Sequence, residues 1–115
     1  MSHIRLGIIS MFFSLLLVSQ AWAAPSSVVQ LVIRNHSFEP QTLTIPAGQQ
    51  VEIMVKNGDV FPAEFESSDL NREKVIPGGT TLPLYVGPLS PGSYRFFNDF
   101  HPSSTGTIVV VPPKR

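Results

Sequence analysis

The sequence contains no cysteine. A chain without cysteine forms no disulfide bonds, and it has no thiolate to offer to a metal ion. In an oxidising compartment, this protein would therefore owe its stability to packing and backbone hydrogen bonds alone. Any metal site in it must therefore do without a thiolate ligand.

The sequence also lacks an excess of charge of either sign, with eight Lys and Arg residues against eight Asp and Glu residues. Removal of an N-terminal segment containing Arg5 would leave seven against eight, a net charge of −1. A balance this even does not favour binding to nucleic acid or to an anionic lipid surface by bulk electrostatics. We therefore expect no nucleic-acid partner.

Long apolar runs are absent except near the N-terminus. His3 and Arg5 precede an apolar run at 8–18, and Ala21-Trp22-Ala23 places small residues where a signal peptidase cleaves. We predict a signal peptide at 1–23 and a mature domain at 24–115, which leaves 115 − 23 = 92 residues. An uncleaved anchor is the alternative, although the run is short against the ~20 residues of a membrane-spanning helix. The mature chain is expected in the periplasm, with no membrane insertion after cleavage.

Short alternating runs separated by turn residues fill the mature sequence. We predict strands at 28–34, 41–45, 51–56, 63–66 and 80–86, and in the runs that begin at Tyr94 and Thr107. The turn between the second and third strands, 45–48, suggests a hairpin, and Pro83 suggests an edge strand. No helix of ordinary length fits. The pattern predicts an all-β fold, a Greek-key two-sheet β-sandwich in one domain.

Two positions carry more specific structural expectations. Tyr94 follows a Pro-Gly turn, as in a tyrosine corner whose hydroxyl donates a hydrogen bond back to the main chain. Residues 67–72 indicate a loop or a single helical turn, and Asn98, Asp99 and residues 102–106 indicate a loop that leaves the strands.

The segment from Tyr94 to Val110 is the strongest candidate for a working site. Asp99 and His101 lie two residues apart in its predicted loop and offer a carboxylate and an imidazole, both ordinary metal ligands. Asp99 has the alternative role of capping its own loop, and His101 that of a solvated loop residue. Two ligands do not complete a site, so further ligands must come from elsewhere.

Glu64 and Glu66 are the first source of further ligands, because side chains two residues apart share one face of a strand. Their alternative is a solvent-facing pair at the edge of the sandwich. His36 is the second source, since the first strand ends beside it; its alternative is an ordinary surface residue. Glu73 lies among Arg72 and Lys74 and is interpreted as a surface salt-bridge partner.

The order of short motifs along the mature chain resembles that of the cupredoxins. The motifs are FEP, IPAG, VKNGD, a later PG, SPGSYRFF, a histidine, and a glycine before the final valine strand. The resemblance implies a cupredoxin-like sandwich with a metal site at one end. Cupredoxins bind copper through a Cys, two His and a Met. Here Asn98 occupies the Cys place, His101 keeps one His place, and Glu64 is the nearest match to the upstream His.

The resemblance implies that this domain has no blue-copper centre, because that centre depends on a copper–thiolate bond. The segments PAEFESSDLNREKVIPGG and YRFFNDFHPSSTG resemble cysteine-free cupredoxin-like domains, of EfeO type, that accompany bacterial ferrous-iron permeases. This resemblance implies a site for iron or copper(II) formed by Glu64, Glu66, Asp99 and His101, with His36 as a further ligand.

The function implied is an accessory role in ferrous-iron uptake, by capture and handover of the ion. A membrane iron permease or a periplasmic iron-binding protein would be its partner. Whether it also assists ferrous-iron oxidation is left open, because no nucleophile-base pair or phosphate loop indicates an enzyme. The alternative is a metal-free protein-interaction domain that kept the sandwich. The clustering of acidic residues and His101 in two segments favours the metal-binding hypothesis.

Overall fold

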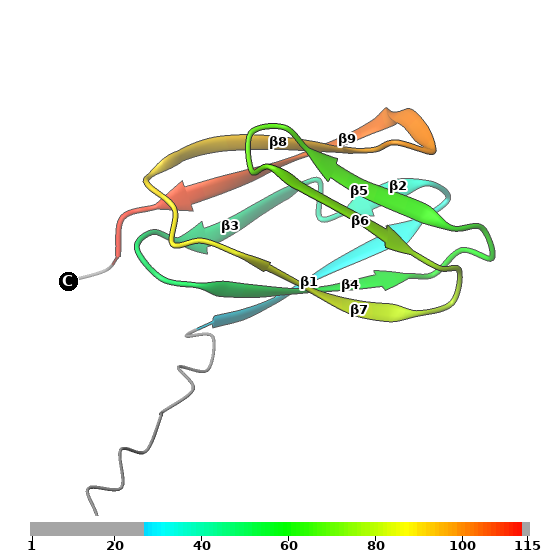
Figure 1. Cartoon of the computed structure of the whole chain (residues 1–115), viewed down its shortest axis with the longest axis horizontal. Helices are drawn as coiled ribbons and strands as arrows, with labels where there is room; N and C mark the ends of the chain where they lie inside the picture. The colour runs from blue at the N-terminus through cyan, green and yellow to red at the C-terminus, as the bar shows by residue number, and fades with distance from the viewer. Residues whose placement is uncertain (1–26, 114–115) are drawn as a thin grey trace, which may run out of the picture.

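The computed structural model describes residues 27–113, which form nine β-strands in two sheets (Figure 1). The predicted signal peptide, 1–23, lies outside the described residues. The predicted all-β two-sheet sandwich is confirmed. The strands are β1 (Ser27–Arg34), β2 (Ser37–Glu39), β3 (Thr42–Pro46), β4 (Val51–Asn57), β5 (Ala63–Ser67), β6 (Arg72–Ile76), β7 (Thr81–Val86), β8 (Gly92–Asn98) and β9 (His101–Val111). Within this range there is no helix long and apolar enough to cross a membrane.

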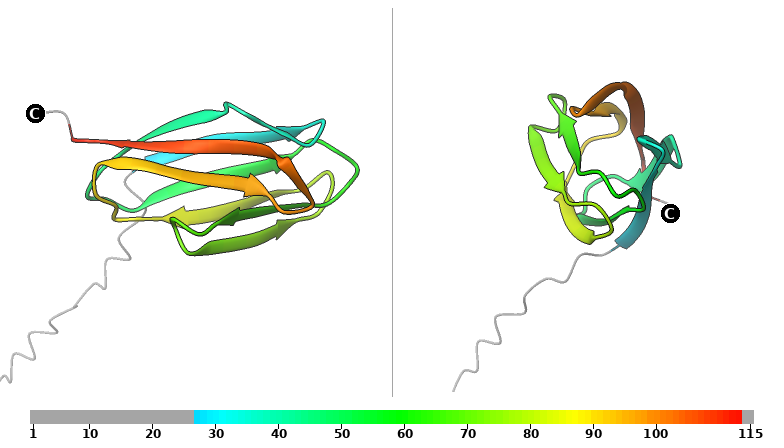
Figure 2. Two further views of the ribbon diagram at one scale, coloured as in Figure 1. Left: turned by 90° about the horizontal axis from the view of Figure 1, so that it is seen from above. Right: turned by 90° about the vertical axis from the view of Figure 1, so that its right-hand side faces the viewer.

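The two sheets differ in size and pack face to face (Figure 2). The four-stranded sheet has the order β2-β1-β4-β7, and the five-stranded sheet has the order β3-β9-β8-β5-β6. The pairs β1–β4 and β3–β9 are parallel, and the other pairs are antiparallel. The chain passes from one layer to the other in the connections β2–β3, β3–β4, β4–β5, β6–β7 and β7–β8, whose strands lie in different sheets.

Alternating apolar residues on the inner faces of both sheets form the core, as the period-two pattern predicts. Phe38, Phe65 and Phe96 lie at its centre. The Phe96 ring meets the Phe38 ring edge-on, with centroids 4.8 Å apart, and stacks on the Phe65 ring at 4.9 Å. Phe61 and Phe100, by contrast, are more than half exposed. Not every phenylalanine is used for packing.

The predicted hairpin between the second and third strands is wrong. β3 and β4 lie in different sheets, and β3 pairs with β9 whereas β4 pairs with β1 and β7. The connecting turn is tied to distant segments instead, because Ala47 N donates to Val111 O and Gly48 N donates to Leu89 O. A Pro-Ala-Gly turn is compatible with a hairpin and with a crossing between layers, and only the long-range pairing distinguishes them.

Two strands were not predicted. β2 is only three residues long and pairs with the end of β1, and β6 occupies a charged stretch next to the segment interpreted as a loop. β6 pairs with β5 over five positions and forms the edge of its sheet. Local sequence gives little strand signal at a half-exposed edge, where pairing with the neighbouring strand decides the conformation.

The predicted long loop between the last two strands is also wrong in extent. β8 continues to Asn98 and β9 begins at His101, so the turn between them is Asp99-Phe100. The register shifts between Phe97, which pairs with Thr105, and Asn98, which pairs with His101. Residues 102–104 are the extra residues on β9. A β-bulge of this kind accommodates proline and serine without ending the strand pair.

The predictions for Tyr94 and Pro83 are confirmed. The Tyr94 hydroxyl donates to Ser90 O at 2.8 Å, and Pro83 lies on β7, the edge of the four-stranded sheet. Lys74 Nζ, on β6, donates to Pro83 O at 2.6 Å, and Arg72 Nε donates to Tyr85 O. Two basic side chains thus join the β6 edge of one sheet to the β7 edge of the other.

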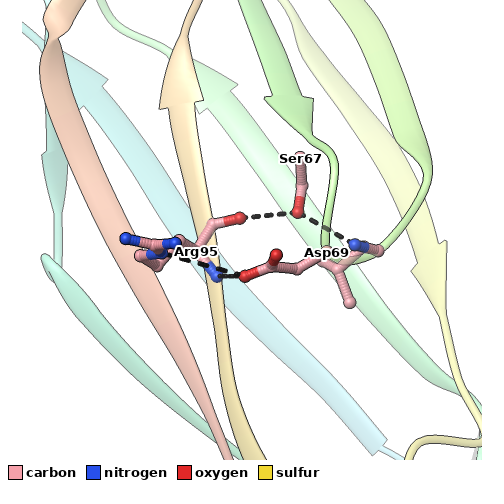
Figure 3. Close-up of polar contacts among 4 residues, drawn as sticks. Ser67, Asp69 and Arg95 are labelled. Carbon is pink, nitrogen blue, oxygen red and sulfur yellow. Dashed lines mark hydrogen bonds and ion pairs between the residues drawn. The ribbon is translucent and has the colours of Figure 1, made fainter.

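Side chains extend the β5–β8 pairing beyond the last residues that pair through the backbone (Figure 3). Ser67 Oγ donates to Arg95 O at 2.6 Å and accepts from Leu70 N at 3.1 Å. The Asp69 carboxylate accepts from Arg95 N at 2.8 Å. This arrangement fixes the β5–β6 connection against β8, on the same sheet as the predicted ligands.

Candidate metal site

Three connections gather at the end of the sandwich away from the C-terminus: the β1–β2 turn, the β4–β5 loop and the β8–β9 turn (Figures 1 and 2). Asn35 and His36 form the two-residue β1–β2 turn with φ values of 50° and 66°, and a type I′ turn requires positive φ at both of these positions. Their two N–H groups donate to the Asp59 carboxylate at 2.7 and 2.8 Å. Asp59 thereby ties the turn to the β4–β5 loop.

The imidazole of His36 lies between two other rings. It stacks on the His101 ring, with centroids 4.5 Å apart, and on the Phe61 ring at 5.4 Å. His101 Nδ1 lies 3.1 Å from Ser103 Oγ and 3.3 Å from Ser104 Oγ. The two predicted histidines are therefore neighbours, and serine hydroxyls orient one of them.

The carboxylates form a separate group on the outer face of the five-stranded sheet. Because neighbouring residues on a strand face opposite ways, the inward Phe65 places Glu64 and Glu66 outside. Asp99 N donates to Glu64 O at 2.9 Å, so the β8–β9 turn lies against β5. Ligand oxygens of Glu64, Glu66 and Asp99 all lie within 4.8 Å of one another.

Glu64 is the least ordinary member of this group. Glu64 is 7% exposed, and its Oε1 has no hydrogen-bond partner among the residues that the structure describes. A hydrogen bond with the Glu73 carboxyl, followed by burial and the nearby negative charges, raises the pKa of Glu64 to about 7. A buried carboxylate without a cation is costly, and the raised pKa reflects that cost.

Glu66 shows the same effect more weakly. Burial raises its pKa first, and the charges of Asp99 and Glu73 add to the rise. A nearby negative charge disfavours the ionised form of a carboxyl group. A bound cation relieves this repulsion.

Sequence reasoning missed Glu73 as a member of the cluster. Glu73 on β6 pairs directly with Glu66 on β5, so their side chains share the outer face. Glu73 makes none of the ion pairs among the described residues, which are Arg34–Glu39 and Arg95–Asp69. The sequence could have revealed this neighbour only if β6 had been recognised as a strand, because Glu73 lies opposite Glu66 through the pairing of β6 with β5.

The five predicted ligands therefore fall into two groups, Glu64 with Glu66 and Asp99, and His36 with His101. In the part of the chain that the structure describes, the carboxylate trio is the only set of three or more ligand side chains within reach of one ion. The histidine pair lacks a third such side chain at that range.

Asn98, at the place where the resemblance puts the cysteine, is fully buried. Its Oδ1 accepts from Glu64 N at 3.0 Å and from Phe100 N at 3.1 Å, whereas no group within residues 27–113 accepts from its Nδ2. Asn98 therefore holds together the two segments that carry the carboxylate group, because it accepts hydrogen bonds from the backbone of β5 and from the turn that carries Asp99.

Comparison with known proteins agrees with this fold. The sequence model of the cupredoxin-like domain matches residues 7–110, which is most of the chain. The chain belongs to the cupredoxin-like domain family. An uncharacterized protein of Rickettsia prowazekii (strain Madrid E) is 32% identical to this cupredoxin-like domain over 83 residues, or 72% of this chain. The match spans 66% of the length of that relative, slightly under two thirds.

Solved cupredoxins share the architecture. A purple cupredoxin from Nitrosopumilus maritimus is 23% identical, with a TM-score of 0.58 over 72% of this chain and 99% of that one. Amicyanin from Paracoccus versutus is 21% identical, with a TM-score of 0.59 over 77% and 86%. The metal-binding domain of a Cu(I)-exporting P-type ATPase from Streptococcus pneumoniae D39, solved with Cu(I), is 14% identical, with a TM-score of 0.63 over 73% and 84%. At these identities the likeness concerns the fold.

The residues of this cupredoxin-like domain do not fit a blue-copper ion. The sequence has no cysteine to form the copper–thiolate bond, and the buried Asn98 amide replaces it. Glu64, the nearest sequence match to the upstream histidine, leaves β5 on the outer face, whereas Ala63 and Phe65 face inward. The donor set that is present consists of carboxylate oxygens, which suit a harder cation.

Proposed function

We propose that this cupredoxin-like domain is a periplasmic metal-binding protein, an accessory of ferrous-iron uptake that holds iron or copper(II) without a blue-copper site. The observation that carries the proposal is the carboxylate group of Glu64, Glu66 and Asp99, in which the buried Glu64 Oε1 has no hydrogen-bond partner among the described residues. An unpartnered buried carboxylate oxygen beside two further carboxylates is the arrangement that a cation stabilises.

The distribution of basic residues supports a cation from outside the chain. Arg72 and Lys74 flank Glu73 in sequence but point to the other side of β6, where they donate to carbonyl groups of β7. Arg34 pairs with Glu39, in the other sheet. The protein thus places four carboxylates together, while the two basic side chains that flank Glu73 are engaged elsewhere.

The ligand chemistry supports iron or copper(II) over a soft ion. Carboxylate oxygens bind hard and borderline cations, and the chain offers no thiolate to a soft one. The site lies on a sheet face beside an exposed turn, so an ion can enter and leave without unfolding. Capture and handover to a membrane iron permease or to a periplasmic iron-binding protein is the role that this exposure supports.

A titration of the mature protein, residues 24–115, tests the proposal. We expect the protein to bind one Cu(II), or one Fe(II) under anaerobic conditions, per chain, without intense blue colour. Glu64→Gln should weaken binding at least about tenfold, because the variant removes a charged ligand while keeping the side-chain shape. Glu39→Gln, which changes an exposed carboxylate of the four-stranded sheet, should bind as the wild type does.

His101→Ala separates the two predicted groups of ligands. If this variant binds as the wild type does, the carboxylates hold the ion by themselves. Loss of binding would mean that the imidazole joins the carboxylates when the ion is present. Equal binding by the wild-type protein and Glu64→Gln would show that the carboxylate group is not the site.

The second candidate function is a metal-free protein-interaction domain. The observation that favours it is the exposure of Val60, Phe61 and Phe100, at 85%, 56% and 52%, on loops at the same end of the sandwich. Exposed apolar side chains gathered on one surface are typical of protein contacts. Failure of the wild-type protein to bind either ion would favour this function.

A further inference from the structure

A groove crosses the outer face of the five-stranded sheet next to the carboxylate group. Its volume is about 560 Å³, and its lining includes Arg95, Phe97, Thr105 and Thr107. Phe97 supplies an apolar surface, the two threonines supply hydroxyl groups, and Arg95 supplies a positive charge. A groove of this size and chemistry suits a small organic anion.

The groove and the carboxylate group lie on the same face of the sheet, and the strand register relates them through Phe97, which lines the groove. Glu66 pairs with Phe97, and Phe97 pairs with Thr105, so these three residues form one row across the outer face. Arg95 and Thr107 form the next row of the same face. Two residues along a strand span about 7 Å, so a molecule with several carboxylates can extend from the row of Glu66 to the row of Arg95.

Arg95 retains most of its capacity to bind an anion. Its side chain is 86% exposed, and its only ion pair with another described residue joins Nε to Asp69 at 4.0 Å. The Asp69 carboxylate is already engaged by the backbone N–H of Arg95 at 2.8 Å. In Figure 3 the guanidinium extends from β8 on the side of β9. A planar guanidinium binds a carboxylate through two parallel hydrogen bonds.

We propose that the groove binds a small polycarboxylate that also ligates the ion held by Glu64, Glu66 and Asp99. This inference rests on the proposed function. Iron and copper(II) take about four to six ligands, so the three protein carboxylates leave positions for an outside donor. A further anion would be repelled by the carboxylates alone, and Arg95 offsets that repulsion from the far end of the groove.

Equilibrium dialysis of radiolabelled citrate against the Cu(II)-loaded mature protein tests the inference. The Cu(II) titration without citrate comes first. We then expect one citrate per loaded chain and a changed electron paramagnetic resonance spectrum of the protein-bound Cu(II), because citrate oxygens replace water. Arg95→Gln should retain citrate at least about tenfold more weakly, and should bind Cu(II) alone as the wild type does. The control is Arg34→Gln, which removes an exposed arginine from the other sheet.

The outcomes distinguish the two proposals. If the protein binds Cu(II) but does not retain citrate, the proposed citrate site in the groove is wrong and the proposed metal site is unaffected. The same conclusion follows if citrate removes Cu(II) from the protein, or if Arg95→Gln retains citrate as the wild type does. A protein that binds no metal in the first titration would overturn both proposals.

Discussion

Two carboxylates near one end of the sandwich lie in opposite surroundings. Asp59 accepts hydrogen bonds from two backbone N–H groups, those of Asn35 and His36. Glu64 is buried with one oxygen unpartnered and a second carboxyl, that of Glu73, beside it. Both oxygens of the Asp59 carboxylate are engaged in holding the fold, whereas one oxygen of Glu64 is left for a ligand.

The pKa values shift in opposite directions for these reasons. The hydrogen bond from His36, followed by that from Asn35 and the nearby positive charges, outweighs burial and lowers the pKa of Asp59 below 3.8. The Glu64 pKa rises from 4.5 to about 7. Asp59 therefore stabilises the fold at neutral pH and loses this contribution as pH falls through its lowered pKa. Glu64 contributes most below pH 4.5, and its contribution is lost as pH rises through about 7.

The largest effect is expected on removing the Asp59 carboxylate. Asp59→Ala leaves two N–H groups of a left-handed turn without their acceptor, and hydrogen bonds to a charged group contribute about 1.5–3 kcal/mol each. Because water replaces part of this, we expect a loss of about 2–3 kcal/mol in the free energy of unfolding at pH 7, measured by denaturation in urea. Glu39→Gln is the control, and an equal loss in both variants would show that Asp59 has no special role.

The second effect concerns the pH dependence of the metal-free protein. The wild-type melting temperature should fall as pH rises from 5 to 8, because the folded state must ionise Glu64 among other carboxylates. Glu64→Gln has no proton to lose and should show a clearly smaller fall. Thermal unfolding monitored by circular dichroism in the presence of a chelator measures both. Parallel pH profiles for the two proteins would contradict the raised pKa of Glu64.

The smallest effect is expected on the pKa of Glu64 when its neighbour Glu73 is changed. Glu73→Gln removes the first cause of the raised pKa, so the pKa of Glu64 should fall toward 4.5 while burial and the charges of Asp99 and Glu66 keep it above that value. Carbon-detected NMR titration of the Glu64 carboxyl measures the shift. An unchanged pKa in this variant would mean that Glu73 does not interact with Glu64.

Much of the fold was predictable because strands with one buried face follow a period of two. The alternation of Val51, Ile53 and Val55 located β4, and the Pro-Gly turn before Tyr94 located the corner that its hydroxyl closes. β6 escaped prediction because its pattern is mostly exposed, with Ile76 its one buried residue. The mistaken hairpin at 45–48 arose because a turn sequence does not say which sheet the next strand joins.

The candidate site was predictable in composition and only partly in arrangement. Glu64, Glu66 and Asp99 come together because β5 and the β8–β9 turn are neighbours in one sheet. His101 is two residues from Asp99 and yet stacks on His36, because it begins β9 and the turn separates it from the outer face.

The sequence by itself determined that this chain is a β-sandwich without thiolate chemistry, since composition and alternation depend on local residues alone. Only the tertiary structure decided which acidic side chains lie together. The register of β5 against β6 and β8 adds Glu73 to the carboxylate group, and the same register places this group on the face that carries the groove lined by Phe97 and Arg95. Register is a property of paired strands, so residues distant in sequence become one site only when the sheet forms.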